Sequence, residues 1–490
     1  MEKEHTPMER RAPRWLLVSL ALCFVAGVLR AWVVLAHDPL IALANSYDEV
    51  RYTACFDLYP DRAADIPPTR NSPEAPYERY RFIPGASPIC YWSSELAFQA
   101  LTVAVYRVGE WFGGTPSHSI RCIGALKFIA LCVVWLAFTA AWLRRNAHQA
   151  ALANGLLLPL LFADPANTVY LNTFYAEWTA LLGAYALCGL ILLEHDSRRS
   201  ALRFCLLAAA AFVLATSKIQ HLLLPLACAV VLLALHWLRT RCWSWQGNAV
   251  LIGAIAGLAL QGVQLGRDSE TIRAIEMFNR ADVAFMGLLP NARDPAATAL
   301  RLGVDVDCLR FIGKRAWQMD DYPGHACPSL QNLTRRRELI ALAAEPDMAL
   351  RLGWNGVLAL EPWLAPGLGL VQGGNFAPLP REIPTFSSVL SAAPALRMLV
   401  LAAPLLAALA VLCSGAGWRR PRVQLYCVLT AVIMRASLTV TLLGDGLADT
   451  PKQGHLVLNA ALAWWIVLAA LAPVARRGSA RGVDTVDFDQ

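Results

Sequence analysis

Two lysine–histidine pairs with identical spacing are the most specific chemical feature of this sequence. Lys218 is followed three residues later by His221, and Lys452 is followed three residues later by His455. Residues three apart in a helical turn share one face, so each pair would point both side chains the same way. Each pair also opens an apolar stretch, and the free N–H groups at a helix start favour an anion. The pairs, together with Gln220, predict a phosphate-binding site. Contact with lipid headgroups is the alternative interpretation.

Acidic residues form the second candidate group. Asp48 and Glu49 are adjacent and follow the first apolar stretch. Two carboxylates at a membrane surface can act as a general base or can hold a divalent cation such as Mg²⁺ or Mn²⁺. A solvated loop would also explain this pair. Asp445 and Asp449 lie beside two glycines shortly before Lys452, where they could contact sugar hydroxyls or a metal.

Ionisable residues inside apolar stretches form the third group. Such residues are costly in a membrane and are usually functional or paired. Glu177 lies inside one stretch and Arg435 inside another, so they could belong to the site or form an ion pair with each other. Lys127 and Arg30 lie in positions from which a long side chain can reach the membrane interface, and we set them aside.

Membrane-spanning helices are the elements expected to position these residues. Hydrophobic residues make up 57% of the 490 residues and charged residues only 16%, a balance that soluble domains do not show. A helix needs about 20 apolar residues to cross the bilayer. Ten stretches approach this length and predict an all-α polytopic membrane protein with large extracytoplasmic loops. They are 15–36, 122–143, 149–163, 174–193, 201–217, 220–238, 249–265, 389–413, 423–443 and 456–474.

The charges between these stretches predict the topology. Every second connection carries arginines, whereas the other connections carry the acids, lysines and histidines described above. By the positive-inside rule the arginine side is cytoplasmic, so both termini are cytoplasmic and the candidate site is extracytoplasmic. The first stretch is too long for a signal peptide and is expected to remain as an anchor. The arginine clusters are Arg144–Arg145, Arg198–Arg203, Arg239–Arg241, Arg419–Arg422 and Arg476–Arg481.

Two extracytoplasmic segments are long enough to fold outside the bilayer. The loop 37–121 contains an amphipathic run, Leu96–Phe112, that is expected to lie in the membrane interface. Residues 266–388 are expected to form a small external domain of mixed structure. The predicted parts of the chain are a cytoplasmic N-terminus (1–14), a first membrane part (15–265), the external domain (266–388), a second membrane part (389–474) and a cytoplasmic tail (475–490).

Four of the 13 cysteines lie in the predicted outer segments, where disulfides can form. Cys55, Cys90, Cys308 and Cys327 allow three pairings. The simplest pairing joins neighbours in the sequence, Cys55 with Cys90 and Cys308 with Cys327. The sequence shows no cysteine or histidine spacing typical of a metal site.

Several other classes of function lack support in the sequence. It contains no P-loop, no dinucleotide fingerprint and neither of the HExxH and GxSxG motifs. The predicted cytoplasmic loops are short and basic, too small for a domain that binds a nucleotide sugar. The net charge of +7 comes mostly from the arginine clusters, so it predicts no nucleic-acid partner.

Together these features resemble the GT-C-type membrane glycosyltransferases of bacteria. In that superfamily a catalytic acid in the first outer loop is followed by an amphipathic helix, and a large region lies outside. Asp48–Glu49, Leu96–Phe112 and residues 266–388 occupy those places. The Gly444–His455 segment is also similar to the late outer-loop motif of glycan-biosynthesis hexose transferases.

The resemblance implies transfer of a sugar from a polyprenyl-phosphate-linked donor to a glycan, lipid or protein of the cell envelope. The reaction would take place at the outer face of the bacterial inner membrane. The resemblance implies Asp48 as general base, assisted by Glu49 and Glu177, which could instead bind a metal. The residues implied to hold the lipid phosphate are Lys218, His221, Arg435, Lys452 and His455.

Two alternatives remain open at this point. One is a polymerase or ligase that moves whole glycans between undecaprenyl-pyrophosphate carriers and relies on external arginines (Arg301, Arg310 and Arg315). The other is a transporter of lipids or glycans without chemistry. Transporters are often built from repeated halves, which the sequence does not show.

Overall fold

The computed structural model describes most of the chain. The described residues are 12–44, 46–63, 65–68, 76–87, 89–193, 200–267, 270–362, 369–373, 379–380, 383, 385–418 and 420–480. Four arginines of the predicted clusters lie outside them, namely Arg198, Arg199, Arg419 and Arg481.

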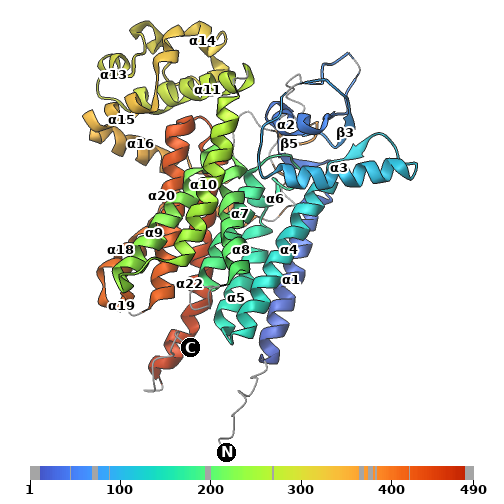
Figure 1. The fold of residues 1–490 in the computed structure, drawn as a ribbon, viewed down its shortest axis with the longest axis vertical. Coiled ribbons are helices and arrows are strands. Elements are labelled where there is room, and N and C mark those ends of the chain that lie inside the picture. The colour runs from blue at the N-terminus through green and yellow to red at the C-terminus, as the bar shows by residue number, and fades with distance from the viewer. Residues whose placement is uncertain are drawn as a thin grey trace, which may run out of the picture.

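A bundle of apolar helices forms the body of the molecule (Figure 1). Helices occupy each of the ten predicted stretches. Within the described residues, six helices are long and apolar enough to cross a membrane, and four more are apolar but shorter. The chain is therefore a helical multi-pass membrane protein. The long helices are α1 (Arg14–Leu35), α4 (Arg121–Arg144), η4 with α9 (Ile219–His221 and Leu223–Thr240), α10 (Trp245–Gly266), α18 (Pro394–Cys413) and α20 (Pro421–Asp445). The shorter ones are α5 with the π-helical turn η2 (His148–Leu157 and Leu158–Phe162), α7 (Glu177–Leu193), α8 (Ala201–Ser217) and the apolar part of α22 (His455–Ala480).

Small residues let these helices pack closely, as the contact of α8 with α10 shows. The hydroxyl of Ser244 accepts a hydrogen bond from the Gly247 N–H and so caps the start of α10. A Cβ at Gly253 would lie 2.1 Å from the backbone oxygen of Ala208 on α8, so glycine is required there. Close approach through small residues is typical of helices that associate within a membrane.

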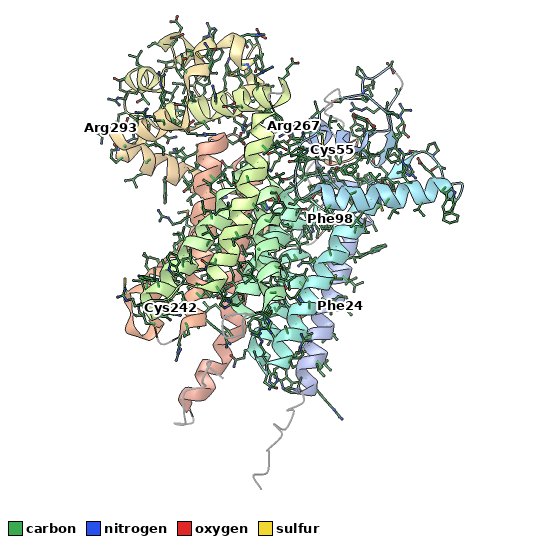
Figure 2. The ribbon with its side chains drawn as sticks, viewed as in Figure 1. Phe24, Cys55, Phe98, Cys242, Arg267 and Arg293 are labelled. Atoms are coloured by element: carbon green, nitrogen blue, oxygen red, sulfur yellow. A yellow bond between two sulfur atoms is a disulfide. The ribbon has the colours of Figure 1, made fainter. Side chains whose placement is uncertain are left out.

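The two ends of the bundle differ in charge and in what they carry. At one end lie Arg144, Arg203 and Arg241, each at the end of its helix or within its first turn. We call this the arginine end. Helix α1 begins there and α22 ends there (Figure 1). The opposite end carries two folded lobes, and we call it the domain end. Figure 2 shows Cys242 near the arginine end and Cys55 at the domain end.

The larger lobe is helical and has its own apolar core. The disulfide Cys308–Cys327 lies within it, and its core includes Phe285, Phe311 and Leu352. Residues 266–388 contribute the helices of this lobe and one strand, β5 (Gly369–Val371), which pairs with the smaller lobe. The elements of the larger lobe are α11 (Glu270–Asp282), η5 (Val283–Leu288), α12 (Leu289–Asn291), α13 (Pro295–Leu302), η6 (Val306–Phe311), η7 (Ala316–Gln318), α14 (Pro323–Ala326), η8 (Pro328–Asn332), α15 (Arg335–Ala344) and α16 (Pro346–Ala359).

The smaller lobe contains short strands, which corrects the expectation of an all-α protein. Strands β2, β3 and β4 form an antiparallel sheet in that order, and β1 pairs antiparallel with β5. The disulfide Cys55–Cys90 lies in this lobe. Backbone N–H and C=O groups outside helices need partners, and these strands supply them. The elements are β1 (Ile41–Ala44), α2 (Ser46–Thr53), η1 (Ala54–Phe56), β2 (Leu58–Pro60), β3 (Arg79–Phe82), α3 (Leu96–Trp111) and β4 (His118–Ser119).

Helix α3 lies across the bundle axis at the domain end and projects from the body (Figure 1). Its outer end carries Trp111 and Phe112, which are 82% and 77% exposed. Leu101, Val105 and Val108 are also exposed along it. An apolar face with aromatic residues at this level of the bundle is typical of a helix in the membrane interface.

The remaining short helices connect the bundle. Helix α6 follows η2, α17 precedes α18, α19 precedes α20, and α21 precedes α22. Their bounds are α6 (Pro165–Thr168), α17 (Ser388–Ala392), α19 (Gly415–Trp418) and α21 (Thr450–Gln453). Helix α21 matters for the site, because it begins just after the glycine turn that ends α20.

Candidate functional site

Asp48 and Lys452 form an ion pair at the domain end of the bundle. The Lys452 Nζ atom lies 2.5 Å from Oδ2 of Asp48. The hydroxyl of Tyr175 donates to the same oxygen at 3.2 Å, and Arg51 binds the other carboxylate oxygen. The ammonium of Lys452 also lies 4.5 Å from the centre of the Tyr175 ring. Asp48 is thus held by three side chains from three segments of the chain.

Lys218 and Glu177 form a second ion pair beside the first. The Lys218 Nζ atom lies 2.9 Å from Oε1 of Glu177, and it donates to Oε1 of Gln453 at 2.7 Å. Gln453 follows Lys452 in α21, so the two lysine segments meet here. Glu177 and Lys218 are both buried, at 2% and 8% exposure. The structure therefore brings together the two lysines of the repeated motif, each with a carboxylate partner.

The two histidines of the motif lie close together, with their rings in an edge-to-face arrangement. The ring centres of His221 and His455 are 6.1 Å apart. His455 is fixed by the carbonyl oxygens of Lys452 and Glu177, each 3.1 Å from a ring nitrogen. His221 Nδ1 lies 3.0 Å from the Ser217 hydroxyl. Both rings are buried, so the motif forms one compact cluster rather than two separate headgroup contacts.

The charges in this cluster stabilise the ionised form of Asp48. Burial alone would raise the pKa of Asp48, but Lys452 and Arg51 hold that pKa well below its usual range. Burial would lower the pKa of Lys452, yet Asp48 and Glu177 raise it above its ordinary value. Burial lowers the pKa of Lys218, which Glu177 only partly offsets. The carboxylate of Asp48 and the ammonium of Lys452 are both charged at neutral pH.

Glu49 points away from this cluster and holds α2 in position. Its Oε1 atom accepts from the Phe174 N–H at 3.0 Å, and its Oε2 atom accepts from the Tyr80 hydroxyl at 2.9 Å. It is 1% exposed, and burial raises its pKa to about 7. Adjacent residues on a helix face different directions. Asp48 therefore meets the lysines while Glu49 ties α2 to β3 and to residue 174.

Lys127 is fully buried, so the interpretation that it reaches the membrane interface is wrong. Its Nζ atom lies 2.7 Å from Oε1 of Glu95, and both side chains are 0% exposed. It also donates to the carbonyl oxygens of Thr173 and Tyr175 at 2.8 and 3.2 Å. These contacts fix the segment that supplies the Tyr175 hydroxyl to Asp48. Arg30, the other residue set aside, lies 3.2 Å from Asp164.

Arg435 is exposed on α20 and forms no ion pair with Glu177. It lies ten residues before Asp445 in α20, which corresponds to about 15 Å along the helix. The structure therefore does not bring Arg435 to the cluster. The position of a residue in the sequence does not by itself determine whether its side chain faces the bundle or points away from it.

Two further acids lie at the turn between α20 and α21. Asp445 is 7% exposed, and Gly446 follows it with φ 58°, a conformation that favours glycine. Burial raises the pKa of Asp449 to about 7, with Asp445 and Asp48 adding to the rise and Lys452 opposing it. Gln220 lies against Gly444 at the same turn. These residues border the lysine cluster, as their sequence positions predict.

A divalent cation does not fit the acids as they stand. The part of the chain that the structure describes contains no group of three His, Cys, Asp or Glu side chains placed to hold a metal ion. Glu49 is engaged by Tyr80 and Phe174, and Glu177 by Lys218.

Several buried polar atoms around the lysines have no hydrogen-bond partner within the described residues. Buried polar groups are normally satisfied, so a group of exceptions indicates a place where a polar ligand or ordered water binds. The atoms are the Tyr170 hydroxyl, Gln220 Oε1, His221 Nε2, Asp449 Oδ1 and the Thr450 hydroxyl.

An apolar pocket lies next to the cluster. It has a volume of about 360 Å³ and runs between η2 with α6 and α17–α18 with α22. Pro451 and His455, on either side of Lys452 and Gln453, are among its lining residues. Its outer wall includes Leu160, Phe386 and Val389, which are exposed large hydrophobic side chains. The pocket thus lies between an exposed apolar surface and the segment that carries Lys452.

Sequence reasoning missed four partners of the cluster. Arg51 and Gln453 lie close in sequence to predicted site residues, and the spacing from Asp48 to Arg51 places both on one helical face. Tyr175 and Glu95 gave no such signal, because they reach the site only through tertiary packing.

The comparisons with known proteins identify a family for most of the chain. No curated protein and no solved structure matches it. Residues 7–332 match the family model described as the YfdI N-terminal transmembrane domain. This match covers α1 through η8, including Asp48, Glu177 and Lys218. Because it spans more than half of the chain, the protein belongs to the YfdI N-terminal transmembrane domain family.

Proposed function

We propose that this chain is a membrane glycosyltransferase that takes its sugar from a polyprenyl-phosphate-linked donor. The acceptor is a glycan, lipid or protein of the bacterial cell envelope. The observation that supports this most is the position of the Asp48–Lys452 pair beside the apolar pocket. A cationic cluster next to a lipid-facing pocket fits a ligand with a phosphate and a long hydrocarbon chain.

The two lysines bind the donor phosphate in this proposal. Negative charge grows on the phosphate as its bond to the sugar breaks, and buried cations stabilise that charge strongly. Glu177 holds Lys218 in position through the 2.9 Å contact. The buried oxygen atoms of Gln220 and Tyr170, which have no hydrogen-bond partner within the described residues, are available to the sugar phosphate.

Asp48 is the general base that accepts the proton of the acceptor hydroxyl. In the structure Lys452 holds its carboxylate and keeps its pKa low. A bound phosphate competes for Lys452, so the pKa of Asp48 rises as the donor binds. The oxygen of the acceptor then bonds to the anomeric carbon while the phosphate leaves with the bonding electrons and Asp48 takes the proton.

We also propose how the chain is oriented in the membrane. All ten apolar helices cross the bacterial inner membrane, and the arginine end faces the cytoplasm by the positive-inside rule. The domain end, with the cluster and both lobes, is then extracytoplasmic. Disulfides form in that compartment, which agrees with Cys55–Cys90 and Cys308–Cys327 at this end.

The deciding experiment compares the surface glycans of cells that express variants at equal levels. Asp48→Asn and Lys452→Ala should remove one sugar from a glycan that the wild type modifies, as measured by mass spectrometry. Asp65→Asn is the matched control, because Asp65 is exposed in the same loop. If both variants, normally expressed, leave every glycan unchanged, the proposal is wrong.

The same experiment separates the rival activities. A polymerase or ligase would change the length or attachment of whole glycans and would respond to Arg310→Gln, since Arg310 is exposed on the larger lobe. A transporter forms no covalent product. Asp48→Asn would therefore change no covalent bond in the glycans.

A further inference from the structure

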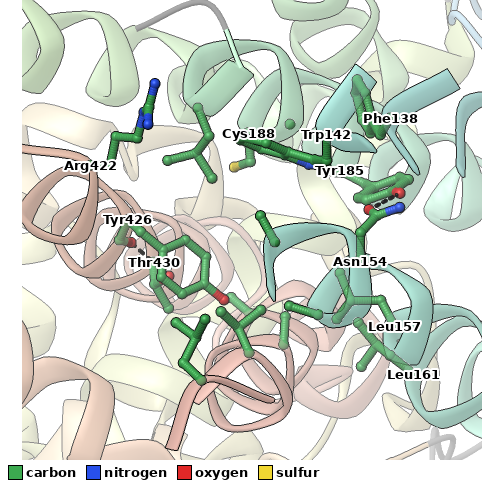
Figure 3. A pocket seen from close by; sticks show the side chains of 18 of the residues that line it. Phe138, Trp142, Asn154, Leu157, Leu161, Tyr185, Cys188, Arg422, Tyr426 and Thr430 are labelled. Atoms are coloured by element: carbon green, nitrogen blue, oxygen red, sulfur yellow. Dashed lines mark hydrogen bonds between the residues drawn. The ribbon is translucent and has the colours of Figure 1, made fainter. Parts of the chain in front are cut away.

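A second apolar cavity lies inside the bundle, apart from the pocket at the domain end. Its volume is about 450 Å³, within the range of about 300–1,000 Å³ found for ligand pockets. Figure 3 looks into it: Tyr426 and Thr430 of α20 line one side, and Tyr185 and Trp142 line another. Five helices contribute, namely α4, α5, α7, α20 and α22.

The lining of this cavity changes along its length. On α22 it extends from Leu456 to Leu471, which corresponds to about 22 Å at about 1.5 Å per residue. Most of the lining is apolar. At the arginine end, however, it includes Arg145, His148 and Arg422. A long apolar cavity with cations at one end is complementary to an amphiphile with an anionic head.

Hydrogen bonds hold one wall of the cavity in shape. The Tyr185 hydroxyl donates to Oδ1 of Asn154 at 2.6 Å, and the Asn154 side chain donates to the Thr139 hydroxyl at 2.9 Å. The Trp135 indole donates to the Asn154 carbonyl oxygen at 2.8 Å. Asn154 is 6% exposed, so this polar group is satisfied by the wall itself. The cavity is therefore preformed.

The cavity and the pocket next to the lysines adjoin and share lining residues. Leu161 and Asn459 line both spaces. Asn459 exchanges two hydrogen bonds with Asn167, of 2.7 and 2.9 Å. Arginines line the cavity at the arginine end but do not line the pocket, so the two spaces favour different ligands.

We propose that this cavity binds a hydrocarbon chain of an anionic phospholipid, whose phosphate is held by Arg145 and Arg422. The lipid belongs to the leaflet at the arginine end. This site is distinct from the donor site of the proposed function and does not depend on it. Occupancy stabilises the packing of α7 against α22, two helices that begin at Glu177 and His455.

The test measures lipid binding by the purified full chain in detergent. After delipidation, phosphatidylglycerol, phosphatidylethanolamine and polyprenyl phosphate are added separately, and bound lipid is counted by native mass spectrometry alongside thermal unfolding. Wild type should bind one phosphatidylglycerol with a rise in Tm. Phosphatidylethanolamine should bind more weakly, because its own ammonium group offsets the charge of its phosphate.

Three variants locate the site. The double variant Arg145→Gln with Arg422→Gln should weaken phosphatidylglycerol binding by about tenfold or more. A tenfold rise in Kd corresponds to a loss of about 1.4 kcal/mol in binding free energy. Ala460→Phe, which fills the cavity, should abolish binding without lowering the Tm of the lipid-free protein. Arg241→Gln is the matched control, because Arg241 is an exposed arginine at the same end outside the lining.

Two results would overturn the proposal. One is unchanged phosphatidylglycerol binding by Ala460→Phe and by the double arginine variant. The other is displacement of phosphatidylglycerol by polyprenyl phosphate, with both lost in Ala460→Phe, which would assign the cavity to the donor chain. Binding is measured without turnover, so the result is independent of whether the glycosyltransferase proposal holds.

Discussion

The ammonium of Lys452 lies 2.5 Å from the carboxylate of Asp48, although 404 positions separate them in the chain. The contact joins α2, in the first loop, to α21, at the start of the last helix. Tyr175 donates to the same carboxylate from a third segment. The centre of the site is thus assembled from three parts of the chain and depends on their relative placement.

Removing one partner of this ion pair should destabilise the protein more than removing both. Lys452 is 3% exposed and Asp48 19% in their side chains. Lys452→Met leaves a buried carboxylate without its main cation, a change that costs about 3–5 kcal/mol. Asp48→Asn combined with Lys452→Met should restore part of that loss, as thermal unfolding in detergent would show.

A surface ion pair provides the comparison for these single and double variants. Arg107 and Glu110 are 55% and 25% exposed, so Arg107→Gln should cost less than about 1 kcal/mol. Equal losses for Arg107→Gln and Lys452→Met would contradict the buried character of the Asp48–Lys452 pair.

Lys127→Met should impair both stability and activity. The variant leaves the carboxylate of Glu95 buried without its cation and releases the carbonyl oxygens of Thr173 and Tyr175. We expect a loss of about 3–5 kcal/mol, partly recovered in the double variant with Glu95→Gln. The double variant should still show less of the proposed sugar transfer, because Tyr175 loses the contact that positions it. Full activity of the double variant would show that Lys127 has no positioning role.

Stability should fall as the pH rises through the range in which Glu49 ionises. Burial raises the pKa of Glu49 to about 7, so the folded protein binds this proton more tightly than the unfolded chain. Between the ordinary carboxyl pKa and about 7 the folded state holds more protons, and the free energy of unfolding decreases by a contribution on the order of 3 kcal/mol. Above that range the contribution is constant.

Glu49→Gln should remove this part of the pH dependence. Unfolding of wild type and variant would be measured from about pH 5 to about pH 8, and the curve of the variant should be flatter. Glu110→Gln is the control, because hydrogen bonds from His118 and Arg107 lower the pKa of Glu110 despite the opposing effect of burial. A slope unchanged by Glu49→Gln would contradict the raised pKa.

Loss of the disulfide in the larger lobe should loosen that lobe selectively. Cys308 and Cys327 are 19 positions apart, and a disulfide that closes a loop of this size contributes about 3 kcal/mol. In the double variant Cys308→Ser with Cys327→Ser, limited proteolysis should cut within residues 270–359 first. The helix bundle should stay intact, because its core is separate from that of the lobe. Cys242→Ser, at an exposed free cysteine, serves as the control.

Local sequence was enough to predict the apolar helices of the bundle and to place the candidate acids, lysines and histidines at one end of it. The predicted stretch 201–217 coincides with α8, because a continuous apolar run in a membrane must satisfy its backbone hydrogen bonds as a helix. The lysine–histidine spacing likewise predicted that each pair lies near a helix start. The two disulfides join cysteines that are neighbours in sequence.

Tertiary structure decided which side chains meet. Arg435 and Glu177 both lie in apolar stretches, yet Glu177 faces Lys218 and Arg435 is exposed. Hydrophobicity barely distinguishes the sides of a helix that is apolar all round, so the rotation of α20 depends on its neighbours. The pairing of Lys127 with Glu95 follows from the packing of α3 on α4, which no local pattern encodes.

The sequence by itself therefore determined a multi-pass helical protein with acids, lysines and histidines gathered at one end. The tertiary structure decided that Asp48 is the acid at the lysines, that Glu49 supports the loop, and that an apolar cavity lies between α5 with α7 and α20 with α22. The physical reason is the distance along the chain over which each interaction acts. Helix formation depends on neighbours along the chain, whereas ion pairs and cavities depend on how distant helices pack.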